Sequence, residues 1–125
     1  MEADGITKWK VKKKMSTLDV LTYGFGLATD QGSVGYSTNA LLRVGNQNIL
    51  IDTGPSSRRG FLVKSLREKG LETDDIDIVI LTHMHWDHCQ NTDLFTKARV
   101  LVNPTEIDYA RAPNKWDLAV AAGMA

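Results

Sequence analysis

The amino-acid sequence predicts an α/β (α+β) fold built on a mixed sheet that contains a βαβ unit. Two apolar, strand-like runs, Asn48–Asp52 and Ile78–Leu81, flank a helical pattern within about thirty residues, the size of a βαβ unit with a right-handed connection. A third run, Thr38–Val44, precedes them across the polar connection Gly45-Asn46-Gln47, which is a hairpin signal. Polar side chains follow both strands of the unit, at the carboxyl ends where open α/β sheets usually bind ligands.

Length and composition are those of an ordinary soluble globular domain. The 125 residues are 42% hydrophobic and 24% charged, which predicts one domain with a buried core. Fifteen basic and fifteen acidic residues give a formal net charge of zero, so neither nucleic acid nor a membrane is expected as a partner. One cysteine makes no intrachain disulfide, and we expect neither a secretory signal nor a membrane span. The expected location is cytoplasmic.

The amino-terminal part is expected to contribute strands and a long loop. Residues 6–11 are interpreted as an outer strand, and the three lysines at 12–14 as charge that protects its edge. A second strand is expected over Leu18–Tyr23. The glycine-rich stretch 24–37 shows no sustained period and is expected to be a loop. Its aromatic residues, together with the one just before it, either contact a substrate or pack inward: Tyr23, Phe25 and Tyr36.

The helix of the βαβ unit has recognisable start and stop signals. Ser56 or Ser57 is expected to cap its amino terminus, and Gly70 to end it. Its apolar residues recur at helical spacing, so one face is expected to pack on the sheet. That face comprises Phe61, Leu62, Leu66 and, at its margin, Val63.

Beyond the second strand of the unit, the pattern alternates between short helices and one more strand. Asn91–Thr96 fits a short helix, and Arg99–Val102 is an apolar strand. Asn103 is expected to cap a further helix, with Pro104 at its first position and Glu106 three residues after the cap.

All three histidines of the chain fall in one short stretch, T-H-M-H-W-D-H-C-Q over residues 82–90. His83 and His85 are two residues apart, so at the end of a strand both imidazoles leave on one side and can share a cation. Asp87 and His88 are adjacent, and in a following helical turn they would face a second cation. Imidazole and carboxylate are ligands that zinc and iron both accept. The stretch therefore predicts a metal site.

The motif H-x-H-x-D-H after an apolar strand resembles the metal-binding signature of the metallo-β-lactamase fold superfamily. The upstream run Ile49–Gly54, which ends in D-T-G, is similar to the strand and turn that this family places before its first helix. Within the superfamily, Cys89-Gln90-Asn91 resembles the N-acyl homoserine lactonase-like branch, whereas hydroxyacylglutathione hydrolases usually have Ala-Gly-Gly there. The resemblance implies the amino-terminal half of an αββα sandwich.

The resemblance also implies a set of roles. His83, His85, Asp87 and His88 would bind metal, with two zinc ions expected and iron or manganese as alternatives. Asp52 would hydrogen-bond to residues 82–90, the metal loop, without binding metal. Asp87 would also pass a proton to the leaving group. Cys89 is expected to be buried and not a ligand. The implied reaction is attack of metal-bound hydroxide on the carbonyl of a lactone or other small-molecule ester. Thioester hydrolysis and iron-dependent persulfide oxidation are the alternatives.

The ligand set in this sequence is incomplete. The family site uses further histidines and a bridging aspartate, and the chain has no histidine outside the motif. Residues 114–125 show no pattern that ends a domain, so 1–125 is interpreted as a single, incomplete domain. The ligands would then come from a missing carboxyl-terminal half or from a second copy in a homo-oligomer. The alternative is a non-catalytic module that binds metal or self-associates through an exposed apolar face.

Overall fold

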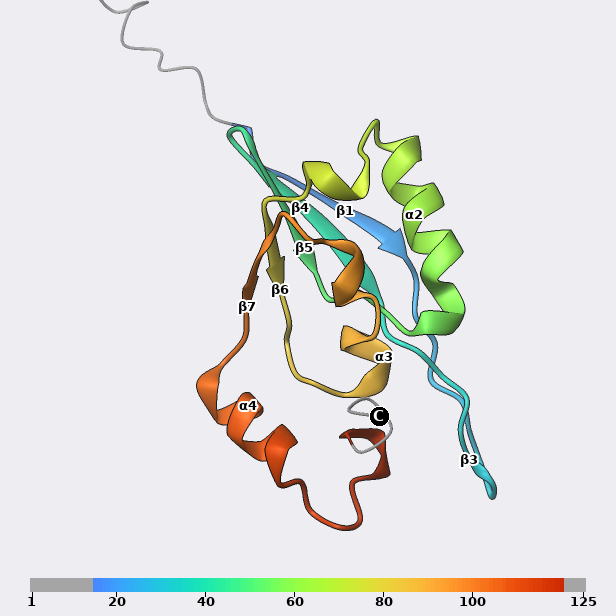
Figure 1. Ribbon diagram of the computed structural model, residues 1–125. Coiled ribbons are helices and arrows are strands. Elements are labelled where there is room, and N and C mark those ends of the chain that lie inside the picture. Colours follow the sequence, from blue (N-terminus) through green and yellow to red (C-terminus); the bar gives the residue numbers. More distant parts are fainter. Residues whose placement is uncertain (1–14, 121–125) are drawn as a thin grey trace, which may run out of the picture.

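The computed structural model describes residues 15–120, which form a five-stranded mixed sheet with the strand order β1-β4-β5-β6-β7 (Figure 1). The first three strands in this order are antiparallel, and β5, β6 and β7 are parallel. The βαβ unit and the hairpin are confirmed. The outer strand expected at 6–11 and the lysines at 12–14 lie outside the described residues. The strands of the sheet are β1 (Thr17–Thr22), β4 (Asn39–Val44), β5 (Gln47–Ile51), β6 (Ile78–Ile80) and β7 (Arg99–Leu101).

Short helical segments connect the strands, and the longest of them, α2, joins β5 to β6. The metal motif contains a single helical turn, α3, as expected. The helix expected over residues 91–96 is only a 3-10 turn. No helix within residues 15–120 is both long and apolar enough to cross a membrane. The helical segments are η1 (Ser56–Arg58), α2 (Arg59–Glu68), η2 (Thr73–Asp75), α3 (Trp86–Cys89), η3 (Thr92–Leu94) and α4 (Pro104–Arg111).

One face of the sheet carries the core. Leu41, Leu50 and Val79 are paired across β4, β5 and β6, so their side chains point to the same side, and all are fully buried. Helix α2 covers them with Leu62 and Leu66. Phe61 was expected on this face of α2, but it is 52% exposed. Leu62 and Leu66 are four residues apart and therefore lie one above the other on the helix, so these two face the core and the neighbouring Phe61 does not.

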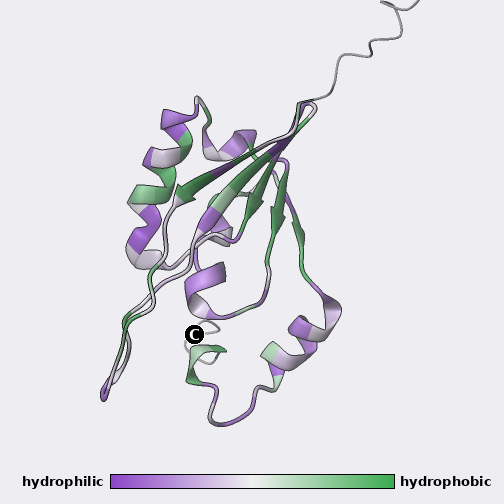
Figure 2. Cartoon of the chain, turned by 180° about the vertical axis from the view of Figure 1, so that it is seen from behind, coloured by the Kyte–Doolittle hydropathy of each residue, from purple (hydrophilic) through white to green (hydrophobic). Residues whose placement is uncertain are grey.

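The opposite face of the sheet is apolar and largely uncovered (Figure 2). Successive side chains of a strand point to opposite faces, so the residues next to the core positions form two further rows across the sheet. Their members are exposed or half-buried, with Leu18 64% exposed. The first row is Leu18, Leu42, Ile49 and Ile78, and the second is Val20, Ala40, Ile51, Ile80 and Leu101. We call these nine residues the open face.

The amino terminus of α2 differs from the sequence prediction, because no side chain from Ser56 or Ser57 caps it. Instead, the Gln90 side-chain oxygen accepts a hydrogen bond from the Ser56 backbone N–H at 2.9 Å. This donor belongs to η1, the turn that leads into α2, and its partner lies in the metal loop, 34 residues away.

The segment 24–37 also differs from the expected plain loop. It contains a two-stranded hairpin, β2 (Ala28–Thr29) with β3 (Gly32–Ser33), which projects away from the main sheet (Figure 1). Its turn uses Gly32 at a φ of 132°, a conformation that glycine adopts readily. Phe25 and Tyr36 pair at its base, with ring centroids 4.7 Å apart in an edge-on arrangement.

Candidate metal centre

The candidate site lies where β5 and β6 end. Asp52 follows β5, and Thr82 and His83 follow β6. Because the two strands are parallel neighbours, their carboxyl ends meet at one edge of the sheet. The chain then turns into α3, which carries Asp87 and His88.

Asp52 has an unusual backbone and a central position. Its φ is 58°, the one positive value at a non-glycine residue between 15 and 120, and aspartate is among the few residues that tolerate it. The side chain is buried and accepts hydrogen bonds from the Thr82 backbone N–H and hydroxyl, each at 2.8 Å. Its Oδ2 also lies 2.7 Å from His88 Nδ1. Asp52 therefore fixes the end of β6 and one imidazole at the same time.

These contacts decide which nitrogen each of two imidazoles can present. A carboxylate only accepts hydrogen bonds, so His88 Nδ1 donates to Asp52 and leaves Nε2 with the lone pair. His83 Nδ1 lies 3.1 Å from the Thr82 hydroxyl, so its Nε2 is likewise the unengaged nitrogen. The set of Asp52, Thr82 and His88 is the buried flank of the site.

The four ligands expected from the sequence are neighbours, but they do not converge. The His83 and His88 rings are 3.9 Å apart between centroids, and the His83 and His85 rings 4.7 Å. Asp87 Oδ2 lies 3.6 Å from His88 Nε2. Within residues 15–120, however, no three side chains of histidine, cysteine, aspartate or glutamate are arranged to hold one ion.

Charge and burial set the protonation of two imidazoles in opposite directions. Burial lowers the pKa of His83, and the neighbouring His88 and His85 lower it further, which favours the neutral form of this ring. Burial also acts to lower the pKa of His88, but the hydrogen bond and charge of Asp52, with the charge of Asp87, outweigh it and raise this pKa. A raised pKa favours the protonated imidazole, so a metal ion competes with a proton for His88.

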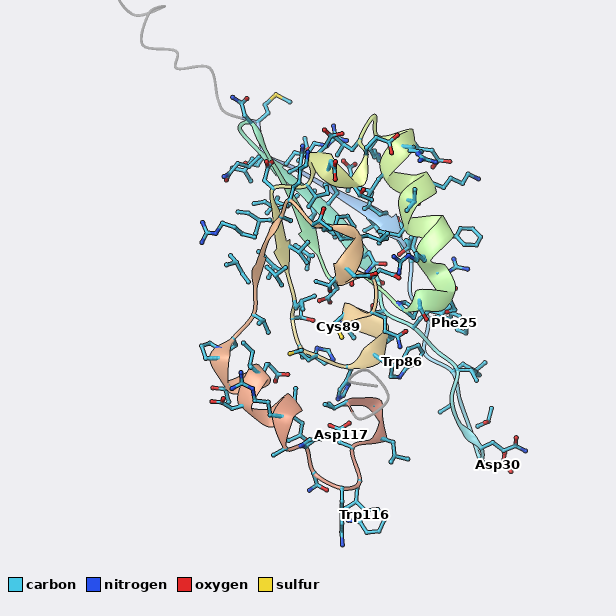
Figure 3. The ribbon with its side chains drawn as sticks, viewed as in Figure 1. Phe25, Asp30, Trp86, Cys89, Trp116 and Asp117 are labelled. Carbon is cyan, nitrogen blue, oxygen red and sulfur yellow. The ribbon has the colours of Figure 1, made fainter. Side chains whose placement is uncertain are left out.

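The other side of the loop is held by residues that sequence reasoning missed. His85 Nε2 lies 3.2 Å from Asp117 Oδ2, and the Tyr109 hydroxyl donates to the same oxygen at 3.0 Å. Partial burial raises the pKa of Asp117, but hydrogen bonds from His85 and Tyr109 lower it overall. In Figure 3 Asp117 lies on the side of α3 away from the sheet, while Trp116 points outward. The set of His85, Asp117 and Tyr109 is the exposed flank.

Helix α4 supports the same side of the loop. The Asn103 side chain caps it by accepting from the Thr105 N–H at 2.9 Å, as expected. Glu106 was expected to complete a capping box, but its carboxylate accepts from the Met84 N–H at 3.3 Å. Glu106, which the sequence suggested as part of the helix start, thus contacts the metal loop.

Asn91 is a second residue whose role sequence reasoning missed. It is fully buried, and its amide donates to the carbonyls of Thr53 and Pro55 at 2.9 Å each. Gly54, between them, has a φ of 76°, and a Cβ there would lie 2.9 Å from the Asn39 side chain. Hydrogen bonds from Asn91 therefore connect the D-T-G turn to the segment that follows α3.

Cys89 was expected to be buried and is half-buried, packed against the core. Burial raises the pKa of its thiol, and the charges of Asp52 and Asp87 raise it further. A neutral thiol is a poor metal ligand, because the thiolate is the form that binds.

A cleft of about 600 Å³ opens beside the motif. His85, Asp87 and His88 are among the residues that line it. Phe25, Tyr36 and Trp86 form apolar parts of its lining; Phe25 and Tyr36 come from the base of the hairpin, and Trp86 from the motif itself (Figure 3). The Ser37 hydroxyl donates to the Asp87 carbonyl oxygen and fastens the hairpin segment to α3.

Comparison with known proteins shows the family to which this fold belongs. The family model of the metallo-beta-lactamase superfamily matches residues 32–125. This chain belongs to the metallo-beta-lactamase superfamily. The five-stranded sheet is accordingly part of a metallo-beta-lactamase fold, which confirms the fold class expected from the sequence.

Relatives in the superfamily are longer than this chain. A probable metallo-hydrolase of Methanocaldococcus jannaschii is 36% identical over 61 residues, which cover 49% of this chain and 30% of the relative. A structure of a putative metallo-beta-lactamase from Thermotoga maritima superposes with a TM-score of 0.68 at 27% identity, covering 87% of this chain and 51% of that one. A dizinc quorum-quenching lactonase, AidC, superposes with a TM-score of 0.55 at 23% identity, over 74% and 40% of the two chains. The chain thus spans about half the length of the Thermotoga structure.

The donor set fits metal ions of the kind that the superfamily implies, but only in part. Imidazole and carboxylate are suitable ligands, and the hydrogen-bond contacts of His83 and His88 with Thr82 and Asp52 are made through Nδ1, which leaves Nε2 of each ring on the side of the other expected ligands. The count falls short, because a catalytic zinc normally has three protein ligands and the four side chains form only close pairs.

Proposed function

We propose that this chain contributes His83, His85, Asp87 and His88 to a two-metal hydrolase site that cleaves a lactone or another small-molecule ester. The single observation that carries the proposal is the cleft, because three of these side chains line it together with aromatic residues. The aromatic residues suit an acyl group, and the polar residues suit the carbonyl to be attacked. The dizinc lactonase with the same fold supports the choice of zinc and of a lactone.

The chain's own residues have distinct tasks in this proposal. Asp52 and Thr82 hold His88 and His83 in place, and Asp87, which lines the cleft, is positioned to pass a proton to the leaving group. Bound metal would supply Lewis acidity and a water of lowered pKa. Phe25, which also lines the cleft, would contact the apolar part of the substrate.

We propose that residues 1–125 form one incomplete domain that does not turn over substrate as a lone monomer. Two ligands for each of two ions are fewer than a catalytic zinc normally has. If four closed on one ion, they would leave no open position for water. Further ligands would come from additional chain or from a second copy.

The test loads the isolated monomer and any larger assembly with zinc or iron, and measures hydrolysis of a lactone, a thioester and a phosphodiester. We expect metal by elemental analysis in both, and turnover only in the assembly or when the remaining half of a longer chain is supplied. The matched control is Asp93→Ala, because Asp93 pairs with Arg59 on the surface, outside the cleft. Metal-dependent turnover by the monomer that disappears in His85→Ala would contradict the proposal.

The open face supports a second candidate, a non-catalytic module that binds metal and self-associates. Within residues 15–120 its nine apolar positions run across five strands, with Leu18, Val20 and Leu101 exposed and the other six half-buried, and a contiguous apolar surface of this kind is typical of an interaction site. Sedimentation velocity with and without a chelator separates the two: a dedicated module gives one defined oligomer, whereas an incomplete domain gives a broad distribution.

A further inference from the structure

One carboxylate outside the metal motif contacts an imidazole inside it. We propose that Asp117 is a positioning residue for His85: it holds Nε2–H, so that His85 presents Nδ1 to a metal, and Tyr109 holds Asp117 in turn. The proposal rests on the metal-binding part of the function proposed above. The contacts that carry it are the 3.2 Å separation of His85 Nε2 from Asp117 Oδ2 and the 3.0 Å hydrogen bond from the Tyr109 hydroxyl to the same oxygen.

The chemistry of the two groups fixes the tautomer. A neutral imidazole has one N–H and one lone pair, and a carboxylate has only acceptors. The nitrogen that faces Asp117 must therefore carry the hydrogen, which leaves the lone pair on Nδ1 of His85. His88 shows the reverse arrangement, because its Nδ1 faces Asp52. His85 and His88, three residues apart in the sequence, thus offer different nitrogens, and each choice is made by a different carboxylate.

Asp117 is itself oriented by its surroundings. The Val120 N–H donates to Oδ1 at 3.3 Å, while Oδ2 takes the Tyr109 hydroxyl, so both oxygens are engaged. The Asp117 N–H donates to the Asn114 carbonyl at 2.8 Å, and Val120 is buried. The Asp117 side chain is 21% exposed against 38% for His85. Its position is therefore set by the fold before any metal binds, which is what a positioning group requires.

The first measurement detects the hydrogen bond without any metal. Proton–nitrogen NMR of the imidazoles in the metal-free 125-residue chain should show a slowly exchanging Nε2–H for His85. In Asp117→Ala this signal should disappear, while the signal of His88 Nδ1–H, held by Asp52, should persist. The matched control is Asp108→Asn, because Asp108 lies on α4 and pairs with Arg111 at the surface, away from the metal loop.

The second measurement is zinc affinity by competition with a chromophoric chelator. Loss of the partner that orients a ligand typically weakens metal binding about 10–100-fold, and we expect this for Asp117→Ala. Asp117→Asn keeps an oxygen that accepts from Nε2–H and should restore part of the affinity. Tyr109→Phe should weaken binding in the same direction by less, and Asp108→Asn should leave it unchanged.

The outcomes separate this proposal from the function on which it rests. An unprotected His85 Nε2–H in the parent chain, or the same zinc affinity in Asp117→Ala as in the parent, would overturn the positioning role. If Asp117→Ala does not fold by circular dichroism, Tyr109→Phe decides, because it removes one contact to Asp117 and leaves the carboxylate. If the parent binds no zinc, the hydrolase proposal fails, and the exchange of His85 Nε2–H alone decides whether Asp117 orients the ring.

Discussion

On each flank of the metal loop a carboxylate holds an imidazole, but one carboxylate is buried beside the sheet and the other is partly exposed. On the buried flank, Asp52 is only 3% exposed, lies on a strained backbone directly after β5, and takes hydrogen bonds from the chain after β6. On the exposed flank, Asp117 comes from a segment beyond the last strand and is shared between His85 and Tyr109. The buried carboxylate joins core strands to the site, whereas the exposed one joins only the loop to a peripheral segment.

This difference predicts where stability and metal affinity are coupled. A change on the buried flank disturbs both, because the same carboxylate satisfies a backbone donor and orients a ligand. A change on the exposed flank should alter metal affinity with little effect on folding, since surface substitutions away from core features usually change stability only slightly.

The largest effect is expected for Asp52→Ala. It leaves the Thr82 N–H and His88 Nδ1 without their acceptor and places alanine at a φ of 58°. We expect the free energy of unfolding to fall by about 3 kcal/mol and zinc affinity to fall about 10–100-fold. Urea denaturation followed by tryptophan fluorescence, with chelator competition, measures both.

Asp52→Asn is the matched control for that variant. Asparagine tolerates the same backbone and is close in shape, so it should lose less stability than alanine while still misorienting His88. Equal zinc affinity in the parent and in Asp52→Ala would contradict the role assigned to this carboxylate.

The next effect is expected for Asn91→Ala, which leaves the carbonyls of Thr53 and Pro55 without their buried donor. We expect a loss of about 2 kcal/mol in the free energy of unfolding, with metal affinity reduced through movement of α3. Chemical denaturation gives the first quantity. A variant as stable as the parent would show that the D-T-G turn does not depend on Asn91.

Thr82→Val tests whether the buried flank affects zinc affinity separately from the stability of the fold. Valine keeps the shape but lacks the hydroxyl that donates to Asp52 and lies beside His83. We expect zinc affinity about tenfold weaker, at the low end for such a partner, and near-parent affinity in Thr82→Ser, which keeps the hydroxyl. Chelator competition on the two variants side by side decides it.

The smallest effect is expected for Asn103→Ala at the start of α4, the helix that carries Glu106 and Tyr109 on the exposed side. Loss of the cap should cost about 1 kcal/mol of stability. Zinc affinity should change less than in Thr82→Val, as measured by the same competition. A larger loss of stability here than in Asn91→Ala would contradict the expectation that buried contacts next to the site matter more for folding than the exposed cap of α4.

Much of the fold could be predicted because its signals are local. The hairpin, the βαβ unit and the Asn103 cap each depend on residues close together in the chain, and all three are present. One prediction that was wrong concerns a side chain with a distant partner: Ser56 and Ser57 do not cap α2, and the Ser56 N–H in the preceding turn η1 bonds Gln90 from the metal loop.

The sequence by itself determined the donor types of the candidate site and its place after the strands of the βαβ unit, since spacing and strand ends are local properties. Only the tertiary structure decided which nitrogen of each imidazole is unengaged, because that depends on partners 36 residues away at Asp52 and 32 residues away at Asp117. It also decided that the four donors form pairs instead of one convergent set. A contact between distant residues leaves no periodic trace in a sequence, so these features come from the packing of the sheet and its flanking segments.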